Sequence, residues 1–129
     1  MNRQMAKLTA KWWRNKLEFN QHDNGERDLG NLMAAMLADT LAANNTPTAD
    51  QLDAFEENLT ELIMEYDGNT LLLNCDYNPC KMLYDAAISV GIDSSVFPWK
   101  TNSHTTKDEV KVSDGYGAPW EEIHESDFE

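Results

Sequence analysis

The segment from Thr48 to Gly68 constrains the fold most, because it carries a complete set of helix signals. Thr48-Ala49-Asp50-Gln51 has the spacing of a capping box, in which a threonine and a residue three positions later satisfy each other's backbone N–H groups. Gly68 is the residue type that commonly follows a helix C-terminus. Between these signals the apolar residues recur at helical spacing and predict one buried face, formed by Leu52, Phe55, Leu59, Leu62, Ile63 and Tyr66. We expect Leu59 and Leu62 to lie in the core.

Three other segments show helical patterns. Residues 3–18 and 29–43 each place their apolar residues on one stripe, which predicts two amphipathic helices. Asn78-Pro79 supplies an N-cap and a proline at the first helical position of a further helix, which is expected to run to about residue 90. Gly91-Ile92 fits a Schellman ending for that helix.

The remaining segments favour strands. Residues 70–75 are short and apolar, which predicts a central strand. Val96-Phe97 precede Pro98 and favour an extended chain, and residues 110–112 alternate before the turn signal Asp114-Gly115. The order ααα-β-α-ββ predicts an α+β fold, with about four helices packed on a small antiparallel sheet. We expect a single domain over residues 1–120 and a loose acidic tail over residues 121–129, which holds five acids.

Charge is unevenly distributed along the 129 residues. The first 20 residues hold five Lys or Arg and one acid, whereas residues 21–129 hold the other 5 cations and 22 acids, a net charge of −17. A chain this acidic is not expected to bind nucleic acid directly, and it is suited to occupying a basic surface. The chain contains no run of 18 apolar residues, so no membrane-spanning helix is expected. Its two cysteines do not suggest a disulfide framework, and a cytoplasmic setting is expected.

The helix predicted from Thr48 carries a row of acids opposite its apolar face. Its members are Asp50, Asp53, Glu57, Glu61 and Glu65. Like charges four residues apart destabilise a helix by about 0.2–0.5 kcal/mol per pair, and this segment contains no Lys or Arg to relieve them. The row is either a solvated face or a set of carboxylates that stand in for phosphates. Successive members rise about 6 Å along the axis, against about 3.4 Å between phosphates of one DNA strand. A convincing mimic would therefore also need the acidic tail, with residues such as Glu121 and Glu122, or a neighbouring subunit.

Signals for catalysis and for cofactors are weak. The histidines fall in predicted loops or in the tail, without a nucleophile motif, and the glycines form no phosphate-binding loop. Cys75 and Cys80 with the distant His104 match structural zinc spacing poorly. We therefore expect that the protein is not an enzyme, has no catalytic residue and binds no metal or cofactor.

Tryptophans provide the candidate apolar contacts. Trp12 fits the buried stripe of the first helix, so its neighbour Trp13 points about 100° away and is either half covered or an exposed anchor. With five cations beside it, Trp13 makes the first helix a candidate homodimer contact. Two further candidates, Trp99 and Trp120, lie in the aromatic stretches 97–101 and 115–121.

These two stretches, Phe97-Pro98-Trp99-Lys100-Thr101 and Gly115-Tyr116-Gly117-Ala118-Pro119-Trp120-Glu121, carry a resemblance together with Asp76-Tyr77-Asn78-Pro79. Over about residues 46–122 the chain resembles small acidic proteins of phages and conjugative elements, a source that includes anti-CRISPR and antirestriction inhibitors. The resemblance implies a mobile-element origin and assigns no catalytic residue. It implies a partner that is a basic nucleic-acid-binding protein of the host bacterium, a CRISPR effector or a restriction enzyme. The alternative is a structural or adaptor protein of such an element.

Overall fold

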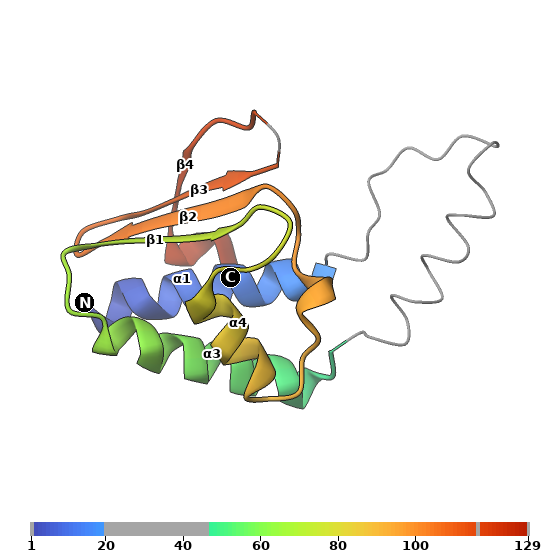
Figure 1. The fold of residues 1–129 in the computed structure, drawn as a ribbon. Coiled ribbons are helices and arrows are strands. Elements are labelled where there is room, and N and C mark those ends of the chain that lie inside the picture. Colours follow the sequence, from blue (N-terminus) through green and yellow to red (C-terminus); the bar gives the residue numbers. More distant parts are fainter. Residues whose placement is uncertain (1, 20–46, 116, 129) are drawn as a thin grey trace, which may run out of the picture.

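A computed structural model describes residues 2–19, 47–115 and 117–128 (Figure 1). Three α-helices lie in these ranges: α1 (Arg3–Phe19), α3 (Ala49–Glu65) and α4 (Lys81–Ile88). Four strands follow the order β1-β2-β3-β4 in one antiparallel sheet. Their bounds are Thr70–Cys75 for β1, Thr101–Thr106 for β2, Val110–Asp114 for β3 and Glu121–Ile123 for β4. Two short 3₁₀ helices, η2 (Ser94–Val96) and η3 (Glu125–Phe128), complete the fold.

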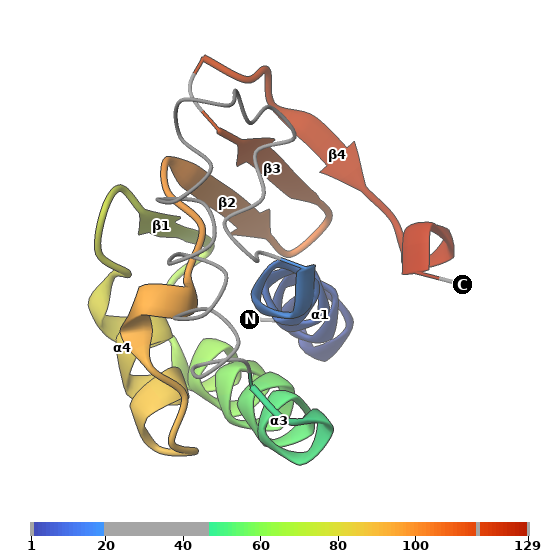
Figure 2. The same ribbon diagram turned by 90° about the vertical axis from the view of Figure 1, so that its right-hand side faces the viewer.

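The helices cover one face of the sheet, and α1 lies between the sheet and α3 (Figures 1 and 2). The predicted α+β class with a small antiparallel sheet is confirmed. The described residues contain three helices where four were expected, and the helix expected over residues 29–43 falls outside the described ranges. None of the described helices is long and apolar enough to cross a membrane.

Two of the predicted helix-end signals are confirmed and two are wrong. α3 ends at Glu65 with Tyr66 as an extended C-cap, so Gly68 is not its C′ residue, and α4 begins at Lys81 after the N-cap Cys80, so Asn78-Pro79 does not start it. The Thr48 hydroxyl accepts the Gln51 backbone N–H at 3.1 Å, and the Gln51 side chain accepts the Thr48 N–H at 2.9 Å. After α4, the Ile92 N–H donates to the Ala87 carbonyl at 2.9 Å, and Gly91 adopts a φ of 78°. Both the capping box and the Schellman motif are therefore confirmed.

The sheet departs from the sequence expectations in four respects. β1 is an edge strand and not a central one, and its Leu72 is 55% exposed. β2 was not expected, because it contains no apolar residue. Val96 lies in η2 and not in a strand, although Phe97 before Pro98 is extended as expected; the Asp93 carboxylate caps η2 by accepting the Ser95 N–H at 2.8 Å. Residues 121–123 pair with β3 and bury Ile123, so this part of the expected loose tail belongs to the sheet.

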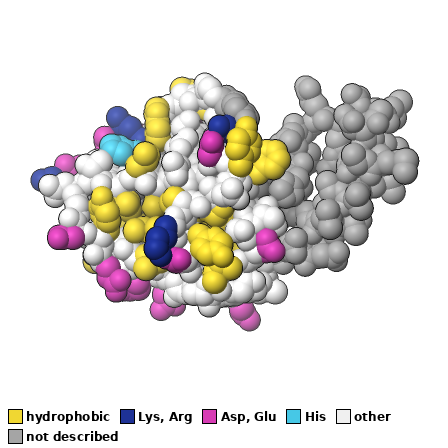
Figure 3. Space-filling model, viewed as in Figure 1, with side chains coloured by type: hydrophobic (Ala, Val, Ile, Leu, Met, Phe, Trp, Pro, Cys, Tyr) yellow, Lys and Arg dark blue, Asp and Glu magenta, His cyan; other side chains and the backbone are white. Residues whose placement is uncertain are grey.

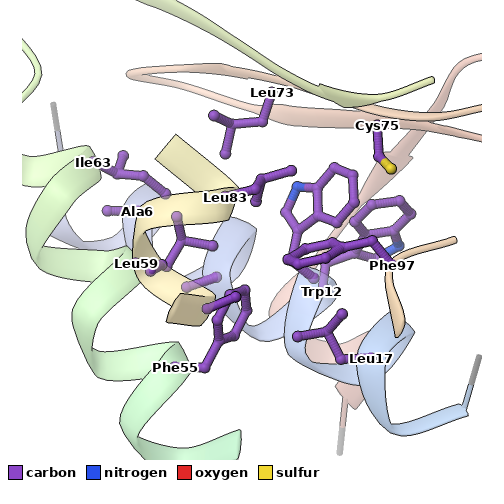
Figure 4. Packing of buried hydrophobic residues seen from close by; sticks show 14 of the residues in the cluster. Ala6, Trp12, Leu17, Phe55, Leu59, Ile63, Leu73, Cys75, Leu83 and Phe97 are labelled. Carbon is purple, nitrogen blue, oxygen red and sulfur yellow. The ribbon is translucent and has the colours of Figure 1, made fainter. Parts of the chain in front are cut away.

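One hydrophobic core joins the helices to the inner sheet face (Figure 4). Leu59 and Ile63 of α3, Leu83 of α4 and Leu73 of β1 meet in this cluster and are all buried. Leu59 is therefore a core residue as expected. Leu62 is only partly buried at the margin of the core, and Tyr66 is 38% exposed.

Polar side chains on the inner face of β2 hold α1 against the sheet. Thr9 and Thr105 place their hydroxyl oxygens 2.6 Å apart, and the Trp13 indole N–H donates to the Ser103 hydroxyl at 2.8 Å. All four side chains are fully buried. Because buried polar groups are costly when unpaired, these two contacts fix the position of α1 along β2.

Candidate protein-binding surface

The acidic row of α3 is exposed, as the helical pattern predicts. Asp50, Asp53, Glu57, Glu61 and Glu65 all face solvent, while the opposite face of the helix packs into the core. That buried face consists of Leu52, Phe55, Leu59, Thr60 and Ile63. The carboxylates therefore stand on an element that packing holds rigidly, which is the usual basis of a preorganised binding surface.

Cations of α1 pair with part of this row. Arg14 contacts Asp53 at 2.8 Å and Glu56 at 3.4 Å, and Arg3 contacts Glu61 at 3.5 Å. These pairs show that α1 and α3 run antiparallel side by side. α3 itself contains no Lys or Arg, as the sequence shows, and part of its acidic repulsion is relieved by the neighbouring helix of the same chain. The basic residues Arg3 and Arg14 meet acids within one molecule, and not those of a second copy.

A groove of about 320 Å³ lies between α1 and α3. Arg3 and Lys7 line one side of it, and Asp53, Glu56, Glu57, Thr60 and Glu61 line the other. Its charges are mixed, with acids in excess.

Three members of the row keep an uncompensated charge in the described part of the molecule. Asp50, Glu57 and Glu65 make no ion pair with any described residue. Asp50 and Glu65 are 15 residues apart, which is about 22 Å along the helix axis. The Arg3–Glu61 pair adds little neutralisation, because both side chains are more than half exposed and such surface pairs are weak. The outer face of α3 therefore remains electronegative.

The acids of residues 121–128 form a separate group. Glu121 is exposed on β4, and Glu122 contacts the His124 imidazole at 2.9 Å. In both ribbon views β4 and α3 lie at opposite ends of the molecule (Figures 1 and 2). The structure does not bring Glu121 and Glu122 together with the α3 row, so the expectation of one combined acidic surface is wrong.

Trp13 is not an exposed anchor. Its side chain is fully buried, with its ring 5.1 Å from Trp12 and 6.2 Å from Phe97 between ring centroids. α1 is covered on two sides, by the sheet and by α3, and this accounts for the burial of both adjacent tryptophans. A dimer built on an exposed Trp13 is therefore excluded.

The other two tryptophans are exposed but lie apart. Trp99 is 59% exposed and stacks edge-on against Tyr77, with ring centroids 5.6 Å apart. Trp120 is 49% exposed and lies 6.5 Å from the His104 ring, beside the sheet face that the helices leave uncovered. Each has the exposure that a partner contact requires.

Besides Tyr66 and Leu72, sequence reasoning missed three exposed apolar side chains: Tyr77, Tyr84 and Ile88. A signal existed for two of them, because positions 84 and 88 lie opposite the inward Leu83, Ala86 and Ala87 of α4. Figure 3 shows hydrophobic side chains spread over the face that β1 and α4 form, and carboxylates along the lower margin where α3 lies.

The cysteines form no evident reactive centre. Burial, together with the nearby Cys80 and Asp76, raises the pKa of the Cys75 thiol to about 11. A thiol with so high a pKa is a poor nucleophile at neutral pH. Within the described ranges, no three His, Cys, Asp or Glu side chains come together as metal ligands.

No known protein family model matches the chain, and no curated protein shows significant sequence similarity to it. The resemblance to proteins of phages and conjugative elements therefore rests on the aromatic and Asp-Tyr-Asn-Pro segments alone.

Proposed function

We propose that this chain is a non-enzymatic inhibitor from a mobile element, which binds a basic nucleic-acid-binding protein of its bacterial host. A CRISPR effector is the leading target, and a restriction enzyme is the second. The observation that carries the proposal is the exposed, rigidly held acidic face of α3, with Asp50, Glu57 and Glu65 uncompensated among the described residues. The mobile-element origin is supported only by the resemblance of residues 46–122.

The mechanism is occlusion of a nucleic-acid channel. Lys and Arg residues that line such a channel would pair with the α3 carboxylates in place of phosphates, and opposite charge would speed the encounter. The Arg3–Glu61 pair does not block this, because an exposed pair is worth at most about 1 kcal/mol and a partner's arginine can replace it.

The spacing of the row favours a cluster of ion pairs over a close copy of a DNA strand. Neighbouring carboxylates rise about 5–6 Å along the axis, compared with about 3.4 Å between phosphates. With residues 121–122 at the other end of the molecule, only α3 would enter the channel. The target's basic residues, and not the geometry of a duplex, would then select the contact.

A competition experiment tests the proposal. Purified effector loaded with labelled guide RNA, or bound to labelled target DNA, is titrated with the protein while the bound label is followed. Release of the label, or blocked loading, is the expected result. The titration is repeated with a restriction enzyme in place of the effector. If neither protein binds the chain or loses its nucleic acid, the proposal is contradicted.

The alternative is a structural or adaptor protein of a phage or conjugative element. The exposed Tyr77–Trp99 pair favours it, because exposed aromatic side chains are typical of protein contacts that need no charge. In that case substitution of the α3 carboxylates would leave partner binding unchanged.

A further inference from the structure

The outward side of α4 is unusually apolar for a helix in so acidic a chain. Lys81, Tyr84, Asp85 and Ile88 share this side at the spacing i, i+3, i+4, i+7. Tyr84 is 44% exposed and Ile88 is 51% exposed. Both remain accessible although the helix buries its opposite side in the core.

A second pair of apolar side chains lies near the N-terminal end of α4. The Lys100 N–H donates to the Asp76 carbonyl at 2.9 Å, which brings residues 99–100 beside residues 76–77. There Tyr77 and Trp99, 53% and 59% exposed, stack against each other. We call the surface formed by Tyr77, Tyr84, Ile88 and Trp99, with Lys81, Asp85, Asp76 and Lys100, the α4 face. Figure 3 shows hydrophobic side chains on the side of the molecule where α4 lies.

The charges of the α4 face cancel within it. Lys81 pairs with Asp85 at 2.7 Å, and Lys100 pairs with Asp76 while its ammonium lies 4.8 Å from the centre of the Tyr77 ring. Two cations thus balance two carboxylates, on a chain whose formal net charge is −13. Two copies can approach through this surface without placing one excess of carboxylates against another.

We propose that the α4 face is a two-fold interface between two copies of this chain. A two-fold interface must be complementary to itself, because each contact between two different residues occurs twice. A surface with equal numbers of Lys and Asp around exposed aromatic side chains meets that condition: Lys81 of one copy can pair with Asp85 of the other. The α3 face, with six acids and no cation on its helix, cannot meet it.

The proposed dimer is independent of the proposed inhibitory contact. No carboxylate of the α3 row belongs to the α4 face, so each copy keeps that row accessible. Loss of dimerisation and loss of target binding can therefore be separated by substitutions on different helices.

Sedimentation equilibrium of the full chain tests the interface, from low micromolar to submillimolar concentration. The parent is expected to show a reversible monomer–dimer equilibrium. Tyr84→Ala and Trp99→Ala should each raise the dissociation constant by at least about fivefold, since truncation of a central aromatic contact commonly costs more than that. The matched control Trp120→Ala removes an exposed tryptophan outside the α4 face and should leave the constant unchanged.

A charge exchange gives a second, independent readout. Lys81→Glu makes the helix side wholly acidic and Asp85→Lys makes it wholly basic, so each variant alone should be monomeric. An equimolar mixture should form a heterodimer, which also shows that both variants are folded. The proposal is overturned by a parent that stays monomeric, by a dimer that survives both aromatic substitutions, by a control that weakens it equally, or by a mixture that does not associate.

Discussion

The buried hydroxyl pair between α1 and β2 allows a prediction in which two similar substitutions have unequal costs. Thr9 donates its only hydroxyl proton to the Met5 carbonyl at 2.9 Å. The proton in the 2.6 Å contact between Thr9 and Thr105 must therefore come from Thr105. Thr105 is thus the donor, and Thr9 accepts from it and donates to its own helix.

Thr9→Val should cost more stability than Thr105→Val. The first substitution leaves the fully buried Thr105 hydroxyl without its acceptor, which costs about 1–3 kcal/mol. The second removes the donor but leaves Thr9 bonded to Met5, so only a net hydrogen bond of about 0.5–1.5 kcal/mol is lost. The double variant leaves no hydroxyl unpaired at this contact and should be no less stable than Thr9→Val alone.

Urea unfolding of the four proteins measures these free energies and their coupling. We expect a coupling energy of at least about 0.5 kcal/mol, in the range seen for residues in direct contact. Thr70→Val, on an exposed strand position, is the matched control and should change the stability by less than about 0.5 kcal/mol. The assignment of donor and acceptor would be refuted if the stability losses of the two single variants sum to that of the double variant within about 0.3 kcal/mol. It would also be refuted if Thr105→Val lost more stability than Thr9→Val.

Three further predictions concern the core, the thiols and the acidic row. Leu59→Ala should lower the free energy of unfolding by about 2–5 kcal/mol, because Leu59 is fully buried; a loss under about 0.5 kcal/mol in urea unfolding would contradict its place in the core. Iodoacetamide at neutral pH should label Cys80 before Cys75, whose pKa of about 11 leaves little thiolate; peptide mass spectrometry showing the reverse order would be inconsistent with this. Glu57→Gln should raise stability by up to about 1 kcal/mol, since it ends two like-charge pairs. Glu61→Gln should raise the free energy of unfolding by less, because it also removes the ion pair with Arg3.

The parts of the fold that were predicted correctly are those encoded locally. The capping box at Thr48 and the Gly91-Ile92 ending depend on a few neighbouring residues, so their signals are visible in the sequence. β2 was missed because its inward residues Thr101, Ser103 and Thr105 are polar, and the partners of Ser103 and Thr105 lie 90 and 96 positions away on α1. Such a strand has no apolar period to detect.

The candidate site was also predicted only in part, because the sequence shows its local features and not its contacts between distant segments. The exposure of the α3 carboxylates follows from the helical period alone. Their pairing with Arg3 and Arg14 depends on the antiparallel packing of α1 against α3, which no local pattern encodes. The burial of Trp13 likewise requires knowing that α1 is covered on two sides.

The central claim is that the α3 carboxylates occupy a basic nucleic-acid channel. It is tested most directly by comparing how two charge-matched variants displace nucleic acid from an effector at different salt concentrations. Glu57→Gln with Glu65→Gln neutralises two α3 carboxylates that make no ion pair among the described residues. Glu121→Gln with Glu125→Gln removes the same charge from β4 and η3, outside the α3 row. Both are titrated against an effector that carries labelled nucleic acid, at several ionic strengths.

If α3 occupies the basic channel, the α3 variant should need a higher concentration to release the label and should show a shallower dependence on salt, while the residue 121/125 variant should match the parent. If the two variants lose equal potency, only the overall charge of the protein matters. If the α3 variant competes as well as the parent at every ionic strength, the acidic row is a solvated face and the proposed contact is wrong.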